Sequence, residues 1–177
     1  GKRFNEVSLF WFDEYLECEC KARLDAVVFA KDGPVIWDLK SFTNISGKEI
    51  NRCVDGEFAN RGYYIDAAFY QRALLSVPVD IIDLDPPIEW PDKIEGAEFN
   101  LLFVEKTNYP NIRARNIVLN DGMGSRSELG QFADGIIKTE AESINEFRRS
   151  HGGKKPWNPI PRIQSIGIET IPLYLMD

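Results

Sequence analysis

Residues 16–40 read LECECKARLDAVVFAKDGPVIWDLK, and their alternation of apolar and polar residues is the strongest indication of the fold. In residues 16–30 every even-numbered residue is apolar, whereas the odd-numbered residues are polar as far as Asp25. A period of two is typical of a β-strand with one buried face. Residues 31–34 (KDGP) favour a tight turn, because glycine supplies a positive φ and proline ends ladder pairing. The stretch therefore predicts a β-hairpin whose second strand covers residues 35–40.

Three charged residues of this hairpin are candidates for a catalytic site. Period two places Asp38 and Lys40 on one face of the second strand, and Asp25 lies in the partner strand. Two converging carboxylates can hold a hard divalent cation, which prefers oxygen ligands. A lysine beside such a cation can orient or deprotonate a water that attacks a phosphate. The spacing therefore favours metal-dependent hydrolysis.

Three segments in a fixed order resemble a known nuclease family. They are CKARLD at residues 20–25, IWDLKS at 36–41 and GYYIDAAFY at 62–70. They are similar to the strand, strand and helix motifs of the RecE-type exonucleases of phages and prophages, within the PD-(D/E)XK nuclease superfamily. The resemblance implies an α/β (α+β-like) fold, in which a central mixed sheet with a catalytic β-hairpin is flanked by helices, as in the restriction-endonuclease-like core.

The resemblance also implies a site that uses Mg²⁺, with Mn²⁺ as a substitute. Its catalytic residues would be Asp25, Asp38, Lys40, Glu6 and Tyr70. Its metal ligands would be Asp25, Asp38, Glu6 and the carbonyl oxygen of Leu39. Lys40 would position the hydrolytic water, and Tyr70 would support the substrate.

One position of the family motif differs in this chain. The helix motif carries a glutamine where this sequence has Asp66, and an aspartate cannot donate the amide hydrogen bond of a glutamine. Asp66 is expected either to add a metal ligand or to lie at the surface. The residues expected to contact DNA are Lys21, Arg23, Ser41, Arg61, Tyr63 and Asp66.

The implied activity is that of a double-strand DNA exonuclease in phage-type recombination. The implied partners are duplex DNA, a single-strand annealing protein and further copies of the chain in a ring. Two alternatives stay open, namely a structure-specific or restriction-type endonuclease and an inactive nuclease-fold module that binds DNA or protein. A sugar hydrolase that uses Asp25 and Asp38 as acid and base is disfavoured, because Lys40 would hold the acid deprotonated.

Length and composition set the remaining limits. The 177 residues, of which 44% are hydrophobic, predict a single globular domain. A net charge of −7 opposes phosphate binding, although bound Mg²⁺ and local basic groups would offset part of it. The sequence holds no run of eighteen apolar residues and no signal-peptide pattern, which favours the cytoplasm of a bacterial or phage-infected cell. Since the family has a helical region upstream, we expect either a fragment or a minimal member.

Periodicity predicts the other elements. Helical spacing of apolar residues indicates helices at residues 63–75 and 129–149, and a weaker pattern indicates one at 49–60. Residues 76–96, rich in proline and aspartate, predict a connector. Alternating or β-branched runs predict strands at residues 7–12, 98–106, 111–119 and 163–176.

Overall fold

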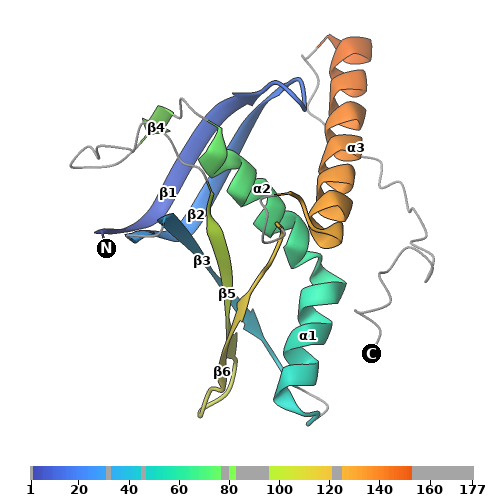
Figure 1. Ribbon diagram of the computed structural model, residues 1–177. Coiled ribbons are helices and arrows are strands. Elements are labelled where there is room, and N and C mark those ends of the chain that lie inside the picture. Colours follow the sequence, from blue (N-terminus) through green and yellow to red (C-terminus); the bar gives the residue numbers. More distant parts are fainter. Residues whose placement is uncertain are drawn as a thin grey trace.

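The computed structural model describes residues 2–30, 33–44, 47–76, 80–82, 96–120 and 125–152. The elements are β1 (Lys2–Asp13), β2 (Cys18–Ala30), β3 (Gly33–Phe42), α1 (Ile50–Arg61), α2 (Tyr63–Leu75), β4 (Asp80–Ile82), β5 (Glu98–Glu105), β6 (Ile112–Asn116) and α3 (Glu128–His151). The described strands form one six-stranded sheet in the order β4-β1-β2-β3-β5-β6. β3 and β5 are parallel and the other neighbouring strands are antiparallel, so the sheet is mixed. The three helices lie on one side of it, which confirms the α/β class (Figure 1).

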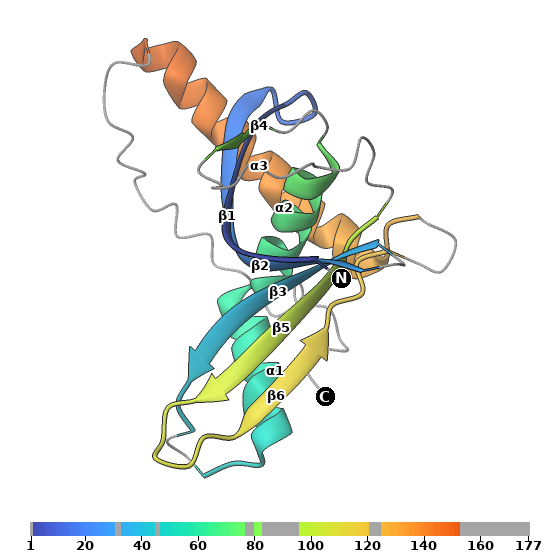
Figure 2. The same ribbon diagram turned by 90° about the vertical axis from the view of Figure 1, so that its left-hand side faces the viewer.

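β1 and β2 form a long hairpin, and the burial of alternate side chains in β2 matches the alternation predicted for residues 16–30. The even-numbered side chains of β2 are buried at Cys18, Ala22, Leu24 and Ala26. This burial removes apolar surface from water and fixes the register, because a slip of one residue would expose the whole apolar set. Both strands turn sharply together part-way along their length (Figure 2).

β3 lies at the centre of the sheet between β2 and β5. Ile36 is fully buried and Asp38 is 4% exposed, which confirms that they share the inward face. The prediction of a turn over residues 31–34 is partly wrong. Gly33 and Pro34 already pair with Ala30 and Phe29 of β2, so only residues 31–32, which lie outside the described part, separate the two strands.

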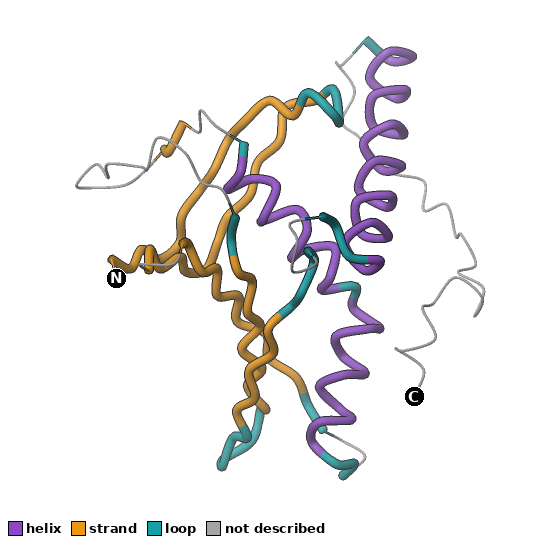
Figure 3. Tube along the Cα trace, in the orientation of Figure 1, coloured by secondary structure: helices purple, strands orange, loops and turns teal. Residues whose placement is uncertain are grey.

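The helices form a second layer, separate from the strands (Figure 3). The predicted helix at residues 63–75 is confirmed as α2, which places Ala67 and Ala68, both fully buried, against the sheet. Gly62 ends α1 and begins α2 with φ 66, a left-handed conformation that glycine adopts at little cost. This junction places the first turn of α2 above β3. α3 packs against α2.

Two predictions at the sheet edges have different outcomes. The predicted connector contains a strand that the sequence did not indicate, since β4 pairs with β1 opposite Ser8, Leu9 and Phe10. The predicted strand at residues 163–176 lies outside the described residues. Within the described part of the chain, no helix combines the length and the apolar character needed to cross a bilayer.

Candidate active site

The candidate site is a fork at which β2 and β3 separate. Their ladder ends at the pair Ala26–Trp37, so the next two residues to face each other would be Asp25 and Asp38. In place of a backbone acceptor, a carboxylate oxygen of Asp25 accepts a hydrogen bond of 2.8 Å from the Leu39 N–H. This contact holds Asp25 beside Asp38, and brings together the two carboxylates that the sequence singled out.

Asp38 is a buried carboxylate with spare bonding capacity. Its buried Oδ2 lies 2.8 Å from the Lys40 Nζ, and no other described group donates a hydrogen bond to it. Burial raises the pKa of Asp38 to about 6; the negative charge of Asp25 adds to this effect and Lys40 opposes it. The charge of Asp38 is therefore only partly compensated by Lys40, and a bound cation would compensate it further.

Lys40 is held between two carboxylates and an aromatic ring. Its Nζ lies 2.8 Å from Asp38 and 3.1 Å from Asp66, and 4.7 Å from the centre of the Tyr63 ring. Burial alone would lower the pKa of Lys40, but the carboxylates of Asp38 and Asp66 outweigh it and raise the pKa above its ordinary value. The side chain is therefore an ammonium at neutral pH and can only donate hydrogen bonds.

Helix α2 packs over the site and contributes side chains to it. Tyr63, Asp66 and Tyr70 lie at positions i, i+3 and i+7 of this helix and so share one face, and two of them contact Lys40 directly. The Tyr70 ring lies 6.0 Å from that of Phe99 in the core. Burial raises the pKa of Tyr70, as do the charges of Asp38 and Asp66, so its hydroxyl keeps its proton at neutral pH.

Glu6 does not lie with the two aspartates. Its carboxylate is 59% exposed and forms an ion pair of 2.7 Å with Arg23. Among the residues whose positions are described, no three histidine, cysteine, aspartate or glutamate side chains lie together as ligands of one metal. The structure thus places Glu6 apart from the two predicted ligands Asp25 and Asp38, and the metal-ligand role of the Leu39 carbonyl stays a prediction.

The residues predicted to contact DNA fall into three pairs. Tyr63 and Asp66 lie at Lys40, as described above. Lys21 and Ser41 are exposed on β2 and β3. The remaining two side chains are exposed but engaged, Arg23 with Glu6 and Arg61 with Glu57.

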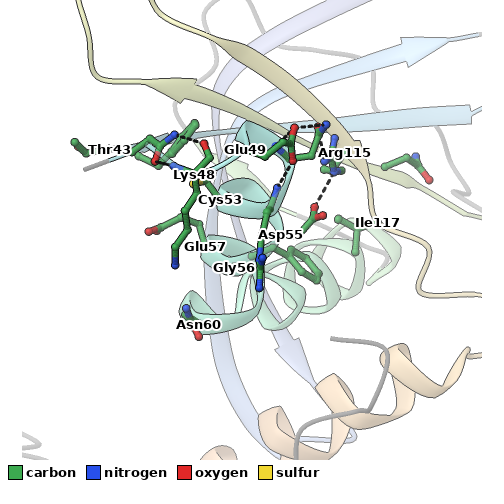
Figure 4. A pocket seen from close by; sticks show the side chains of 16 residues that line it. Thr43, Lys48, Glu49, Cys53, Asp55, Gly56, Glu57, Asn60, Arg115 and Ile117 are labelled. Atoms are coloured by element: carbon green, nitrogen blue, oxygen red, sulfur yellow. Dashed lines mark hydrogen bonds and ion pairs between the residues drawn. The ribbon is translucent and has the colours of Figure 1, made fainter. Parts of the chain in front are cut away.

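A cleft of about 940 Å³ lies between α1 and β6, and neither Asp25 nor Asp38 lines it (Figure 4). Arg115 crosses it, 3.1 Å from Asp55 and 3.0 Å from Asn51. Its lining carries three cationic and three acidic side chains, namely Lys48, Arg52, Arg115, Glu49, Asp55 and Glu57. The cleft thus has balanced charge. No sequence pattern predicted this cleft, because it depends on the distance between α1 and the sheet.

The site combines two adjacent carboxylates with one ammonium group. Carboxylates attract a divalent cation, and an ammonium attracts an oxyanion such as a phosphate. No protein-family model matches the chain, and no curated protein is significantly similar to it. The chemistry of Asp25, Asp38 and Lys40 is therefore the main guide to function.

Proposed function

We propose that the chain is a metal-dependent deoxyribonuclease that hydrolyses phosphodiester bonds of duplex DNA, most closely comparable with the RecE-type exonucleases. The observation that supports this most is the fork, where the buried Asp38 carboxylate lies beside Asp25 and Lys40. The family resemblance implies that the two aspartates bind Mg²⁺ and that Lys40 positions the water. The same resemblance extends the proposal to a cytoplasmic protein that assembles as a ring and works with an annealing partner.

The donor set fits a divalent cation. Asp38 offers a buried carboxylate whose charge is shared only with Lys40, and Asp25 offers a second carboxylate next to it. Mg²⁺ needs only one or two protein carboxylates because it keeps several of its waters. Such a cation, when bound, would stabilise the attacking and leaving oxygens of an in-line displacement at phosphorus.

The chain's own residues would perform the other tasks. Hydrolysis forms a bond from a water oxygen to phosphorus and breaks the bond to the leaving sugar oxygen, which finally receives a proton. Because Lys40 is already protonated, its ammonium would orient the water or a phosphate oxygen and would not act as the base. The Tyr70 hydroxyl would donate a hydrogen bond to the substrate, and Asp66 would hold Lys40 in place from its other side.

One observation favours an inactive binding module as the second candidate. Lys40 is engaged by Asp38 and Asp66 at the same time, so a phosphate would have to compete with Asp66 for it. Binding of DNA or of a protein partner without metal-dependent cleavage would support this candidate.

The test is digestion of linear and supercoiled circular duplex DNA, with and without Mg²⁺ or Mn²⁺. Wild type is compared with Lys40→Ala and with Lys106→Ala, which removes an exposed lysine outside the site. We expect metal-dependent loss of linear DNA in wild type and Lys106→Ala but not in Lys40→Ala. Nicking of the circle would indicate the endonuclease. Intact DNA in every metal would contradict the proposal and favour the binding module.

A further inference from the structure

Both ladders of β2 are interrupted at Asp25, by one missing pair on the β1 side and by the end of the ladder on the β3 side. On one side, the β1–β2 register joins Asn5 to Ala26 and Val7 to Leu24, so the pair between them would join Glu6 to Asp25. That pair is missing from the ladder of the two described strands. On the other side, the β2–β3 ladder stops at Ala26, one residue before Asp25.

The backbone of Glu6 explains the first interruption. Its φ is 55, in the left-handed region that residues with a side chain rarely adopt. This conformation turns the N–H and C=O of Glu6 away from the directions that a strand requires, so the pair with Asp25 cannot form. The exposed ion pair between Glu6 and Arg23 does not account for it, because surface pairs of this kind contribute little.

The second interruption lies on the side of β2 that faces β3. The β2–β3 ladder ends at Ala26, and β1 and β2 turn together part-way along their length (Figure 2). The Leu39 N–H, which a continued β2–β3 ladder would have used, is satisfied instead by the Asp25 carboxylate at 2.8 Å. A single residue in the left-handed region, Glu6, therefore lies opposite Asp25 in the register, and the side chain of Asp25 is placed beside Asp38. Backbone strain of this kind persists where the surrounding structure imposes it, and it is enriched at functional sites.

We infer that Glu6 is a positioning residue that acts through its left-handed backbone conformation, which interrupts the β1–β2 ladder and directs Asp25 to Leu39 and Asp38. The Glu6 carboxylate is not required for this positioning of Asp25. The consequence for metal binding rests on the proposed function, whereas the consequence for the hydrogen bond between Asp25 and Leu39 does not.

The test uses substitutions that separate backbone from side chain. Glu6→Gly permits a positive φ without the carboxylate, Glu6→Gln keeps the shape without the charge, and Glu6→Ala and Glu6→Val disfavour a positive φ increasingly. The readouts are hydrogen exchange of the Leu39 amide by NMR and the Mn²⁺ affinity by calorimetry. We expect Glu6→Gly and Glu6→Gln to keep both at the wild-type level. In Glu6→Val, Leu39 exchange should rise about tenfold and Mn²⁺ affinity should fall by a similar factor.

Glu17 offers a matched control. It is an exposed glutamate with φ 55 and an arginine partner, Arg149 at 3.9 Å, but it lies in the turn between β1 and β2. Glu17→Val should lower the unfolding midpoint as Glu6→Val does, since both force a branched residue into the left-handed region. It should leave Leu39 exchange in the native state and Mn²⁺ affinity unchanged.

Two results would overturn the inference. One is wild-type Leu39 exchange in both Glu6→Ala and Glu6→Val, which would remove the link between the backbone and Asp25. The other is a loss of Leu39 protection or Mn²⁺ affinity in Glu6→Gln as large as in Glu6→Val, which would make the carboxylate the active group. Should wild type bind no Mn²⁺, the proposed function fails, while Leu39 exchange still decides the role of Glu6. Should Glu6→Val not fold, Glu6→Ala against Glu6→Gly gives the same comparison.

Discussion

Two equally buried carboxylates, Asp13 at the tip of the first hairpin and Asp38 at the fork, have opposite surroundings. Each residue is 4% exposed. Asp13 accepts hydrogen bonds from the Trp11 Nε1–H at 3.3 Å and the Leu16 N–H at 3.0 Å, and it pairs with Arg72 at 3.4 Å. All of its partners come from the chain. These contacts offset the cost of burying Asp13 and stabilise the packing of the hairpin tip against α2.

Asp38 lacks such a set of donors. Its Oδ2 has the Lys40 ammonium at 2.8 Å, and its other neighbour of note is a second acid, Asp25. Burial of a charge without full compensation costs stability and is retained where it has a use. The difference between the two sites indicates that Asp13 is structural and that Asp38 is available to a ligand.

The largest expected effect is on cleavage. If Asp38 is a metal ligand, Asp38→Asn should lower the rate of DNA cleavage about a thousandfold, since a bound metal contributes several kcal/mol to transition-state stabilisation. Asp13→Asn, compared at equal concentrations of folded protein, should keep the wild-type rate. The measurement is the initial rate of acid-soluble nucleotide release from linear duplex DNA. More than a tenth of the wild-type rate in Asp38→Asn would contradict the assignment.

The next effect concerns pH. Because the pKa of Asp38 is raised from 3.8 to about 6, the folded state holds this proton more tightly than the unfolded state. The contribution of Asp38 to stability is therefore present below pH 3.8 and is lost as the pH rises to about 6, by up to about 3 kcal/mol. Urea unfolding of wild type and Asp38→Asn should diverge over this window, in favour of the variant. A difference that does not change with pH would refute this.

A direct comparison of stabilities at pH 7 comes third. Asp13→Asn should lower the free energy of unfolding by about 1–3 kcal/mol, because it leaves Arg72 uncompensated and weakens the acceptor for Leu16. Asp38→Asn should cost nothing or should stabilise, since it removes an incompletely compensated buried charge. Both values come from urea unfolding. Equal losses in the two variants would erase the distinction.

The smallest effect is expected at Asp66. Its side chain is 41% exposed, so loss of its ion pair with Lys40 in Asp66→Asn should change the free energy of unfolding by less than about 1 kcal/mol. The same change frees Lys40 for phosphate, and binding of duplex DNA should tighten a few-fold. Fluorescence anisotropy with Ca²⁺ in place of Mg²⁺ measures this. Weaker binding in Asp66→Asn would show that Asp66 does not compete with DNA.

The sequence predicted the features that local periodicity encodes. The apolar face of β2 repeats every two residues and α2 repeats at helical spacing, so both were found in nearly the correct places. The three residues of β4 were too few for a pattern, and their strand exists because β1 offers an edge. The motif located Asp25, Asp38 and Lys40, but the fork itself depends on the backbone of Glu6 and on the separation of β2 from β3, which no local pattern reports.

Calorimetric titration with Mn²⁺ shows whether Asp25 and Asp38 bind a metal, and it does not require DNA. Wild type and Asp13→Asn should bind Mn²⁺ with the same affinity per folded molecule, and Asp38→Asn should bind at least about tenfold more weakly. Equal affinity in Asp38→Asn, or no binding by wild type at millimolar Mn²⁺, would contradict the assignment of Asp38 as a metal ligand.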